Sequence, residues 1–311
     1  MTLSRFQIAS ICFTLALATE PAFAGSRASV ASTGADSGTC PISTPCRTLN
    51  FALSQVDPGG EILIKDSAGY GSGSGVPVNI TKSVTINAPP GVIGFISQPS
   101  GDAITVNALA TDLVILTGLY IDGLATGTNG VTVTTVGSFS IGGSTITGLT
   151  GSPINYINNS TGNQKLTITY ANFYGNGGPI NIKPTAGASF GSSIRGLNLS
   201  STGIVVDNTS NSTANMSVLF DNSILRYNGG IAITANQTGA GFVQVHVNNT
   251  QMYNLNTAFS TSGTASIDLG RSAIFNVSNL CFGGAANVKS FVDNHVANFT
   301  TGCTFSTLAF K

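Results

Sequence analysis

The chain has 311 residues with 38 glycines, no tryptophan and 8% charged residues, and its 12 basic side chains are balanced by 12 acidic ones. A neutral chain lacks the surplus of lysine and arginine that supplies most of the affinity for nucleic acid or an anionic membrane surface, so we expect neither partner. Frequent valine, isoleucine, glycine and asparagine favour strands and turns over helices.

Residues 1–24 are typical of a cleaved signal peptide. Arg5 supplies a positive charge, residues 8–18 form an apolar run, and Ala22 and Ala24 are the small residues of a cleavage site. The apolar run is shorter than the about 20 residues that cross a membrane. We therefore expect cleavage after Ala24, no membrane insertion, and a secreted or periplasmic protein.

Segment 25–60 is predicted to contain a short helix that caps the fold. Thr44 before Pro45 is the pattern of an N-cap followed by proline at the first helical position. Residues 47–56 then carry apolar side chains at helical spacing, namely Leu49, Leu53 and Val56. The Asp-Pro-Gly-Gly run that follows ends the helix before a strand at residues 61–65. We expect the apolar face of this helix to plug the first coil.

Segment 61–298 repeats a single pattern, in which an apolar residue is followed five positions later by another. The pattern occurs eight times, with successive members 22 to 27 residues apart. The first column is Leu116, Ile141, Ile168, Ile194, Phe220, Val247, Leu269 and Val292, and the second is Ile121, Ile146, Phe173, Leu199, Leu225, Met252, Ile274 and Ala297. A further strand precedes each first-column residue and opens at Ile104, Val131, Ile154, Ile180, Ile204, Ile231, Phe259 or Cys281. Three strands per repeat are therefore predicted.

Between the two columns the chain must turn within two or three residues. The turn position holds residues that tolerate left-handed backbone angles, namely Gly118, Gly143, Gly196, Asn222, Asn249 and Asn294. Coils of this kind pair in parallel about 4.8 Å apart, so that like residues stack on like. The predicted fold is an all-β, right-handed parallel β-helix solenoid, its hand following from the strong preference of parallel crossovers. Residues 299–311 form the C-terminal cap through Phe299, Phe305, Leu308 and Phe310.

Four cysteines remain after the signal peptide, and an even number in an exported protein favours disulfides. Three pairings are possible, of which we favour Cys40 with Cys46, beside the capping helix, and Cys281 with Cys303, about one coil apart. Zinc binding is the alternative, but it would need these distant pairs, or His246 and His295, to converge, and no close spacing supports it. We expect no bound metal and no cofactor.

One stretch of the chain resembles a known family. The run from Cys40 to Cys46, followed by Arg-Thr-Leu at 47–49, Pro-Gly-Gly-Glu-Ile at 58–62 and Thr-Lys-Ser-Val-Thr-Ile at 81–86, is similar to the N-terminal cap and first coils of bacterial secreted pectate-lyase-like β-helix proteins. The resemblance implies an exported right-handed solenoid. Some members are lyases, hydrolases, epimerases or tailspikes acting on polysaccharides, and many small members have no known chemistry, so the fold leaves function open.

The sequence offers few carboxyl groups that could act together in catalysis. Glycoside hydrolysis generally needs two carboxyl groups about 5 to 9.5 Å apart, whereas Asp221 and Asp293 share one predicted column but lie three coils apart. A stacked pair of Arg195 with Asp221 is predicted on neighbouring coils and is typical of an exposed ion pair.

A second stacked pair, His246 with Asp268, has the composition of an acid/base site. A carboxylate can orient a histidine for proton transfer, and Arg271 on the following corner would place a cation nearby. We favour an ordinary surface contact and assign no catalytic residue, so His246, Asp268 and Arg271 are candidates only if the protein is an enzyme.

Three classes of function fit the sequence. We favour a non-catalytic exported solenoid for surface or glycan contact, with a polysaccharide or cell-surface glycan as partner. The alternatives are a polysaccharide lyase or glycoside hydrolase, and a purely structural exported protein. Tyrosine rings can stack on sugars, and the candidates are Tyr120, Tyr170, Tyr174, Tyr227 and Tyr253. The sequence leaves the oligomeric state open.

Overall fold

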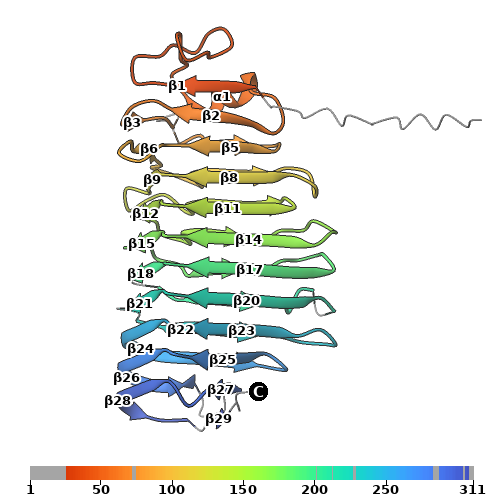
Figure 1. The fold of residues 1–311 in the computed structure, drawn as a ribbon, viewed down its shortest axis with the longest axis vertical. Helices are drawn as coiled ribbons and strands as arrows, with labels where there is room; N and C mark the ends of the chain where they lie inside the picture. The colour runs from red at the N-terminus through yellow and green to blue at the C-terminus, as the bar shows by residue number, and fades with distance from the viewer. Residues whose placement is uncertain are drawn as a thin grey trace, which may run out of the picture.

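A computed structural model describes residues 26–71, 75–200, 202–211, 213–226, 229–282, 287–303 and 305–307. The signal peptide predicted for residues 1–24 lies outside the described residues, as do Leu308 and Phe310 of the predicted C-terminal cap and Tyr227. The described strands stack as parallel rungs of one elongated column (Figure 1). None of the helices in the described part of the chain is long and apolar enough to span a membrane.

The first sheet contains twelve parallel strands, one from each coil. In spatial order they are β1 (Arg27–Val30), β2 (Gly60–Ile64), β5 (Val84–Asn87), β8 (Leu113–Thr117), β11 (Ser138–Gly142), β14 (Gln164–Thr169), β17 (Ser189–Arg195), β20 (Asn215–Asp221), β23 (Val243–Asn248), β25 (Ser266–Gly270), β27 (Val288–Ser290) and β29 (Ser306–Thr307).

The second sheet has seventeen strands and wraps the other two sides of the column. One stack is β3 (Ala68–Gly69), β6 (Gly94–Ser97), β9 (Leu119–Asp122), β12 (Thr145–Thr147), β15 (Asn172–Tyr174), β18 (Asn198–Ser200) and β21 (Ile224–Arg226). The other is β4 (Val78–Ile80), β7 (Ile104–Asn107), β10 (Val131–Thr135), β13 (Ile154–Tyr156), β16 (Ile180–Ile182), β19 (Ile204–Asp207) and β22 (Ile231–Asn236). Three longer strands, β24 (Gln251–Ser262), β26 (Ala273–Cys281) and β28 (His295–Thr301), join the two stacks.

The coil is right-handed, as predicted. In Figure 1 the strands of the first sheet point to the left, the chain passes to the back through the second sheet, and it returns at the right one rung lower. This is the sense expected of parallel crossovers. The structure therefore confirms the all-β, right-handed parallel β-helix.

In each of the two predicted apolar columns, the first seven of the eight residues stack on one another in the structure. From Leu116 to Leu269 each first-column residue pairs with the next, and so does each second-column residue from Ile121 to Ile274. All of these side chains are buried. Each coil buries its apolar face only against its neighbours, which makes the stack the unit of stability.

The predicted register is wrong at two positions. Leu269 pairs with Ser290, so Val292 leaves the column and is 77% exposed. Ile274 pairs with Val296 instead of Ala297. In the third strand, β22 opens at Ile231 as predicted, and Ile204 pairs with Ile233 two residues further on. The physical reason is variable coil length, because a strand is held by its hydrogen-bonded neighbour and the connecting loop absorbs added or missing residues.

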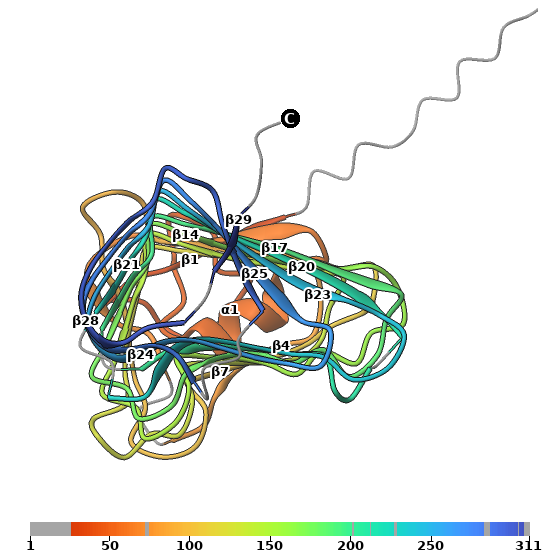
Figure 2. The same ribbon diagram turned by 90° about the horizontal axis from the view of Figure 1, so that it is seen from below.

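The capping helix is α1 (Leu49–Gln55), and its N-cap is Thr48, whose hydroxyl accepts from the Phe51 N–H at 3.3 Å. The predicted N-cap Thr44 is therefore wrong. Cys46, two residues after Thr44, is extended and pairs with Val30 of β1, so the chain cannot begin a helix there. The buried face of α1 belongs to the core (Figure 2) and consists of Leu49, Ala52 and Leu53.

The ends of the stack extend past the predicted segment boundaries. β1 precedes α1 and pairs with β2, so the first sheet already begins within segment 25–60. β28 crosses residue 298, and β29 in the predicted C-terminal cap pairs with β27. In that cap, Phe305 packs against the core while Phe299 is exposed.

Both favoured cysteine pairs lie at disulfide distance. The Cα atoms are 5.0 Å apart for Cys40 and Cys46 and 5.7 Å apart for Cys281 and Cys303. The first pair joins the ends of the loop before α1, and the second joins β26 to the segment after β28.

Candidate functional site

Each coil turns sharply where a strand of the first sheet ends. The residue after the strand adopts a positive φ in seven successive coils, and we call this column the corner: Gly118, Gly143, Tyr170, Gly196, Asn222, Asn249 and Arg271. Five of the six predicted glycine and asparagine members lie there, and so does Arg271, which was expected on a corner, but Tyr170 was missed because its residue type does not signal a left-handed turn. Asn294, predicted as the last member, instead caps a turn, since its Oδ1 accepts from the Ser272 N–H at 2.8 Å and its Nδ2 donates to the Leu269 carbonyl at 3.0 Å.

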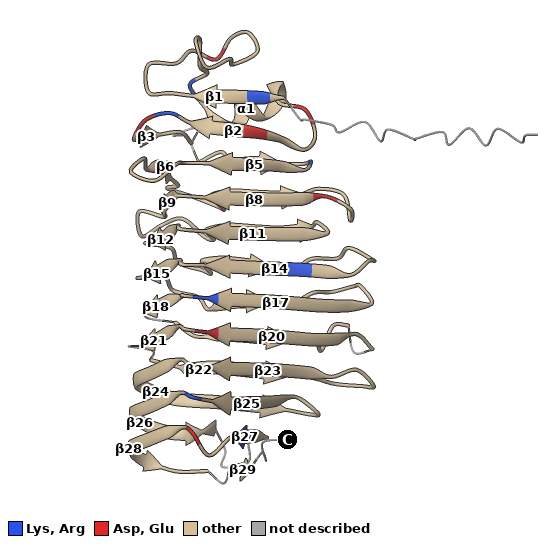
Figure 3. Ribbon diagram, in the orientation of Figure 1, with Lys and Arg blue, Asp and Glu red and all other residues tan. Residues whose placement is uncertain are grey.

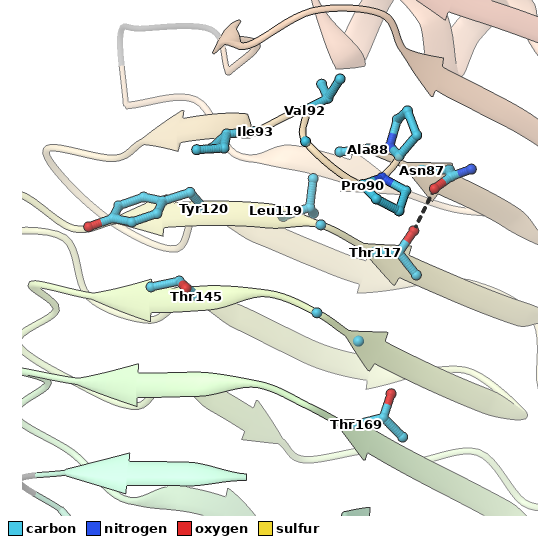
Figure 4. Close-up of a pocket in the computed structure, with 15 residues that line it drawn as sticks. Asn87, Ala88, Pro90, Val92, Ile93, Thr117, Leu119, Tyr120, Thr145 and Thr169 are labelled. Carbon is cyan, nitrogen blue, oxygen red and sulfur yellow. Dashed lines mark hydrogen bonds between the residues drawn. The ribbon is translucent and has the colours of Figure 1, made fainter. Parts of the chain in front are cut away.

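A cavity of about 520 Å³, which we call the groove, lies beside the first rungs of the corner (Figure 4). One wall is the segment 88–93, which contains Pro89 and Pro90. The floor needs glycine, since a Cβ on Gly118 would lie 2.3 Å from the Ala88 carbonyl oxygen, and one on Gly142 would lie 2.7 Å from Oγ1 of Thr169. The loop of one coil and the glycines of later coils therefore create the groove together.

The remaining lining is neutral and combines the apolar Leu119 with polar groups and one aromatic ring. Thr117, Thr145 and Thr169 contribute hydroxyls, and Thr117 donates to Oδ1 of Asn87 at 3.0 Å (Figure 4). Of the described residues that line the groove, none is aspartate, glutamate, lysine, arginine or histidine. The groove is therefore suited to an uncharged ligand with hydroxyl groups.

Tyr120 is held rigidly at the groove. Its ring stacks on Phe95 with centroids 5.4 Å apart, and its hydroxyl lies 3.1 Å from the hydroxyl of Tyr174. The hydrogen bond to Tyr174, with a smaller effect of desolvation, raises the pKa of Tyr120 to about 12. The phenol is therefore uncharged at neutral pH and can donate or accept a hydrogen bond.

A second cavity, of about 430 Å³, lies at the last rungs of the corner, and we call it the His246 cavity. His246, Asp268 and Arg271 all line it, so the structure brings the three sequence candidates together. His246 Nδ1 is 3.5 Å from Oδ2 of Asp268, which also accepts from Nε2 of Gln244 at 2.7 Å. Asp268 is only 7% exposed, and within the described part of the chain its buried Oδ1 has no hydrogen-bond partner.

The predicted pair Arg195–Asp221 also forms, with Nε 3.1 Å from Oδ2, and Figure 3 shows the basic end of β17 directly above the acidic end of β20. It continues towards the His246 cavity, because Asn248 donates to Oδ1 of Asp221 at 2.9 Å and accepts from Nε of Arg271 at 3.1 Å. A polar ladder thus runs along the corner between the two cavities. His295 is not among the described residues that line either cavity.

The groove was missed by sequence reasoning, although it leaves two signals. Pro-Pro-Gly at 89–91 interrupts the chain between two strands, and Gly-Gly at 142–143 follows another strand directly. Their juxtaposition depends on which coils are neighbours. For metals, the described residues include no group of three or more histidine, cysteine, aspartate or glutamate side chains placed to hold an ion.

The chain matches no protein-family model and no curated protein sequence. Its fold is similar to that of the GH136 lacto-N-biosidase from Eubacterium ramulus, in both the native and the selenomethionine crystal structures. The TM-score is 0.52 at 10% identity, over 92% of this chain and 67% of that one. Pectate lyase Pel9A aligns over 91% of this chain and 77% of its own at 14% identity, with a TM-score of 0.46. Identity this low establishes the fold alone, a parallel β-helix, so the activity must be inferred from this chain's own residues.

Proposed function

We propose that this is an exported protein that binds a glycan in the groove without turning it over. The observation that carries the proposal is a neutral cavity of about 520 Å³ with Tyr120 fixed on Phe95 beside it. A sugar presents an apolar ring face and a rim of hydroxyls, which match an aromatic ring and the threonine and asparagine groups. The lacto-N-biosidase of similar fold is by its name an enzyme that acts on a glycan.

A glycan array with the purified, oxidised protein tests the proposal, followed by calorimetry on the glycans that bind. Tyr120→Ala should weaken binding about tenfold, because one stacked ring contributes up to about 1.4 kcal/mol beyond the area it buries. Tyr253→Ala is the matched control, since Tyr253 also stacks on a phenylalanine, Phe275 at 5.1 Å, but does not line the groove. Equal effects of the two substitutions would contradict a site at the groove.

Export is the second part of the proposal and is supported by the two cysteine pairs at disulfide distance. Intact-mass measurement of the protein recovered outside the cytoplasm should give a chain that starts at Gly25. A mature chain that retains the apolar run at residues 8–18 would contradict the predicted cleavage.

An enzyme that acts on polysaccharides, as a lyase or glycoside hydrolase, is the second candidate. It is favoured by the nearly buried Asp268 carboxylate beside His246 in an open cavity. A carboxylate at Nδ1 fixes the ring and leaves Nε2 to exchange a proton with a substrate. Assays for new reducing ends and for unsaturated products on acidic polysaccharides, with and without calcium, test this candidate. Turnover by the wild type that is lost in His246→Ala would replace the non-catalytic proposal.

A further inference from the structure

The corner contains two residues that do not suit its backbone conformation. Five of its seven members are glycine or asparagine, which adopt positive φ readily. The exceptions are Tyr170, with φ of 50°, and Arg271, with φ of 49°. A bulky side chain in this region is an outlier that usually marks a functional constraint. Both exceptions lie at a cavity, since Arg271 lines the His246 cavity and Tyr170 directly follows Thr169 of the groove.

The Tyr170 ring rests on the next coil and remains largely exposed to solvent. A Cβ added to Gly196 would lie 2.6 Å from Cδ1 of Tyr170, so the ring occupies the space that a side chain at position 196 would need. The Tyr170 N–H donates to the Arg195 carbonyl at 2.8 Å, which fixes the backbone. The side chain nevertheless remains 69% exposed. A ring that is supported on one side and open on the other is prepared for stacking without further loss of freedom.

Tyr170 also continues the line of the groove. Gly143, which lines the groove, is the corner residue one coil earlier, and its N–H donates to the Thr169 carbonyl at 2.9 Å. Successive rungs are about 4.8 Å apart. In Figure 4, Thr169 lies at the end of the groove opposite the wall that carries Pro90 and Val92. Tyr170, the residue after Thr169, therefore lies just beyond that far end, with its ring on Gly196 of the following coil.

We propose that Tyr170 is a second stacking residue for the glycan, and that the ligand is a neutral oligosaccharide of at least two sugar rings lying along the corner. This inference rests on the proposed function of the groove. One sugar ring stacks at Tyr120, and another stacks on Tyr170, two rungs further along. Neutrality follows from the uncharged lining of the groove and from the engagement of Arg195, which pairs with Thr169 on the next coil, with Asp221.

The test measures binding and stability on the same variants, by calorimetry with cellohexaose, mannohexaose, chitohexaose and hexagalacturonate, and by thermal unfolding. Tyr170→Asn places at the corner a residue already used there by Asn222 and Asn249. It should weaken binding of the neutral hexasaccharide about tenfold while Tm is unchanged or higher, because the ring is lost and the backbone relaxes. Tyr170→Phe should bind within about twofold of the wild type, since it keeps the ring. Asn249→Gly, a corner change away from the groove, should leave affinity unchanged.

The outcomes separate the two proposals. If a neutral hexasaccharide binds the wild type and Tyr170→Asn equally well, the role of Tyr170 is wrong and the groove proposal stands. If Tm falls and affinity does not, Tyr170 is a packing residue. Binding of hexagalacturonate in preference to the three neutral probes overturns the assigned ligand class. If none of the four probes and no array glycan binds the wild type, the proposed function itself fails.

Discussion

At the scale of single residues, the Tyr120–Tyr174 hydrogen bond should make the stability of the fold depend on pH in the alkaline range. It is the largest cause that raises the pKa of Tyr120 to about 12, above the unfolded value of about 10. A raised pKa means that the folded state favours the protonated phenol, so the stabilisation is fully present below about pH 10 and is lost as pH rises through about 12. We expect the free energy of unfolding, measured in urea, to fall in this window.

Tyr120→Phe should make that alkaline decline shallower, because it removes one titrating hydroxyl and keeps the stacked ring. Part of the decline should remain, since burial also raises the pKa of Tyr70 and Tyr156. Tyr253→Phe is the control and should decline like the wild type. A wild-type curve that stays level from pH 10 to 12 would show that the pair carries no such linkage.

At the scale of elements, mutation can distinguish the N-cap of α1, Thr48, from the predicted N-cap, Thr44. Thr48→Ala removes the hydroxyl that accepts from the Phe51 N–H and should lower the free energy of unfolding by about 1 kcal/mol. Thr44→Ala should have almost no effect, as Thr44 lies before the extended Cys46. Urea unfolding of the two variants measures the difference, and an equal loss in both would contradict the assignment of the cap.

We expect the two disulfides to contribute different amounts to the free energy of unfolding. The chain between Cys281 and Cys303 spans 22 residues, against 6 for Cys40 and Cys46. Closure of the longer loop restricts the unfolded chain more, by about 3 kcal/mol compared with about 2 kcal/mol. Non-reducing peptide mapping should find both disulfides, and the paired serine replacements should then destabilise in that order. A free thiol at any of the four positions would contradict the pairing.

At the scale of the whole molecule, stability should follow position in the stack. A central strand such as β20 pairs with β17 on one side and β23 on the other. The last long strand, β28, pairs with β26, and its side chains are mostly exposed. Because each coil is stabilised by its neighbours, terminal coils open at lower free energy than central ones. Hydrogen exchange should therefore be slowest in β17, β20 and β23 and fastest in β28 and β29, whereas uniform protection would indicate a single cooperative unit.

The apolar repeat was sufficient to predict three strands per coil and the ladder from Leu116 to Leu269, because a pattern that recurs in sequence stacks directly in a solenoid. It failed near the C-terminal end, where Val292 and Ala297 fall outside their predicted columns. A spacing rule assumes a constant coil, whereas strand pairing is decided by hydrogen bonds to the preceding rung. Stacked pairs such as His246 with Asp268 were predictable for the same reason as the ladder, and the role of the pair stays a hypothesis.

The sequence by itself therefore determined the coil, its core and its Gly/Asn corner, since these depend on residue type at a regular spacing. Only the tertiary structure decided where the groove lies and which side chains border it. Segment 88–93, Gly118 and Gly142 meet there from different coils, and the Tyr170 ring rests on Gly196 of the coil that follows. A cavity is the space left between side chains after packing, and no single position in the repeat encodes that space.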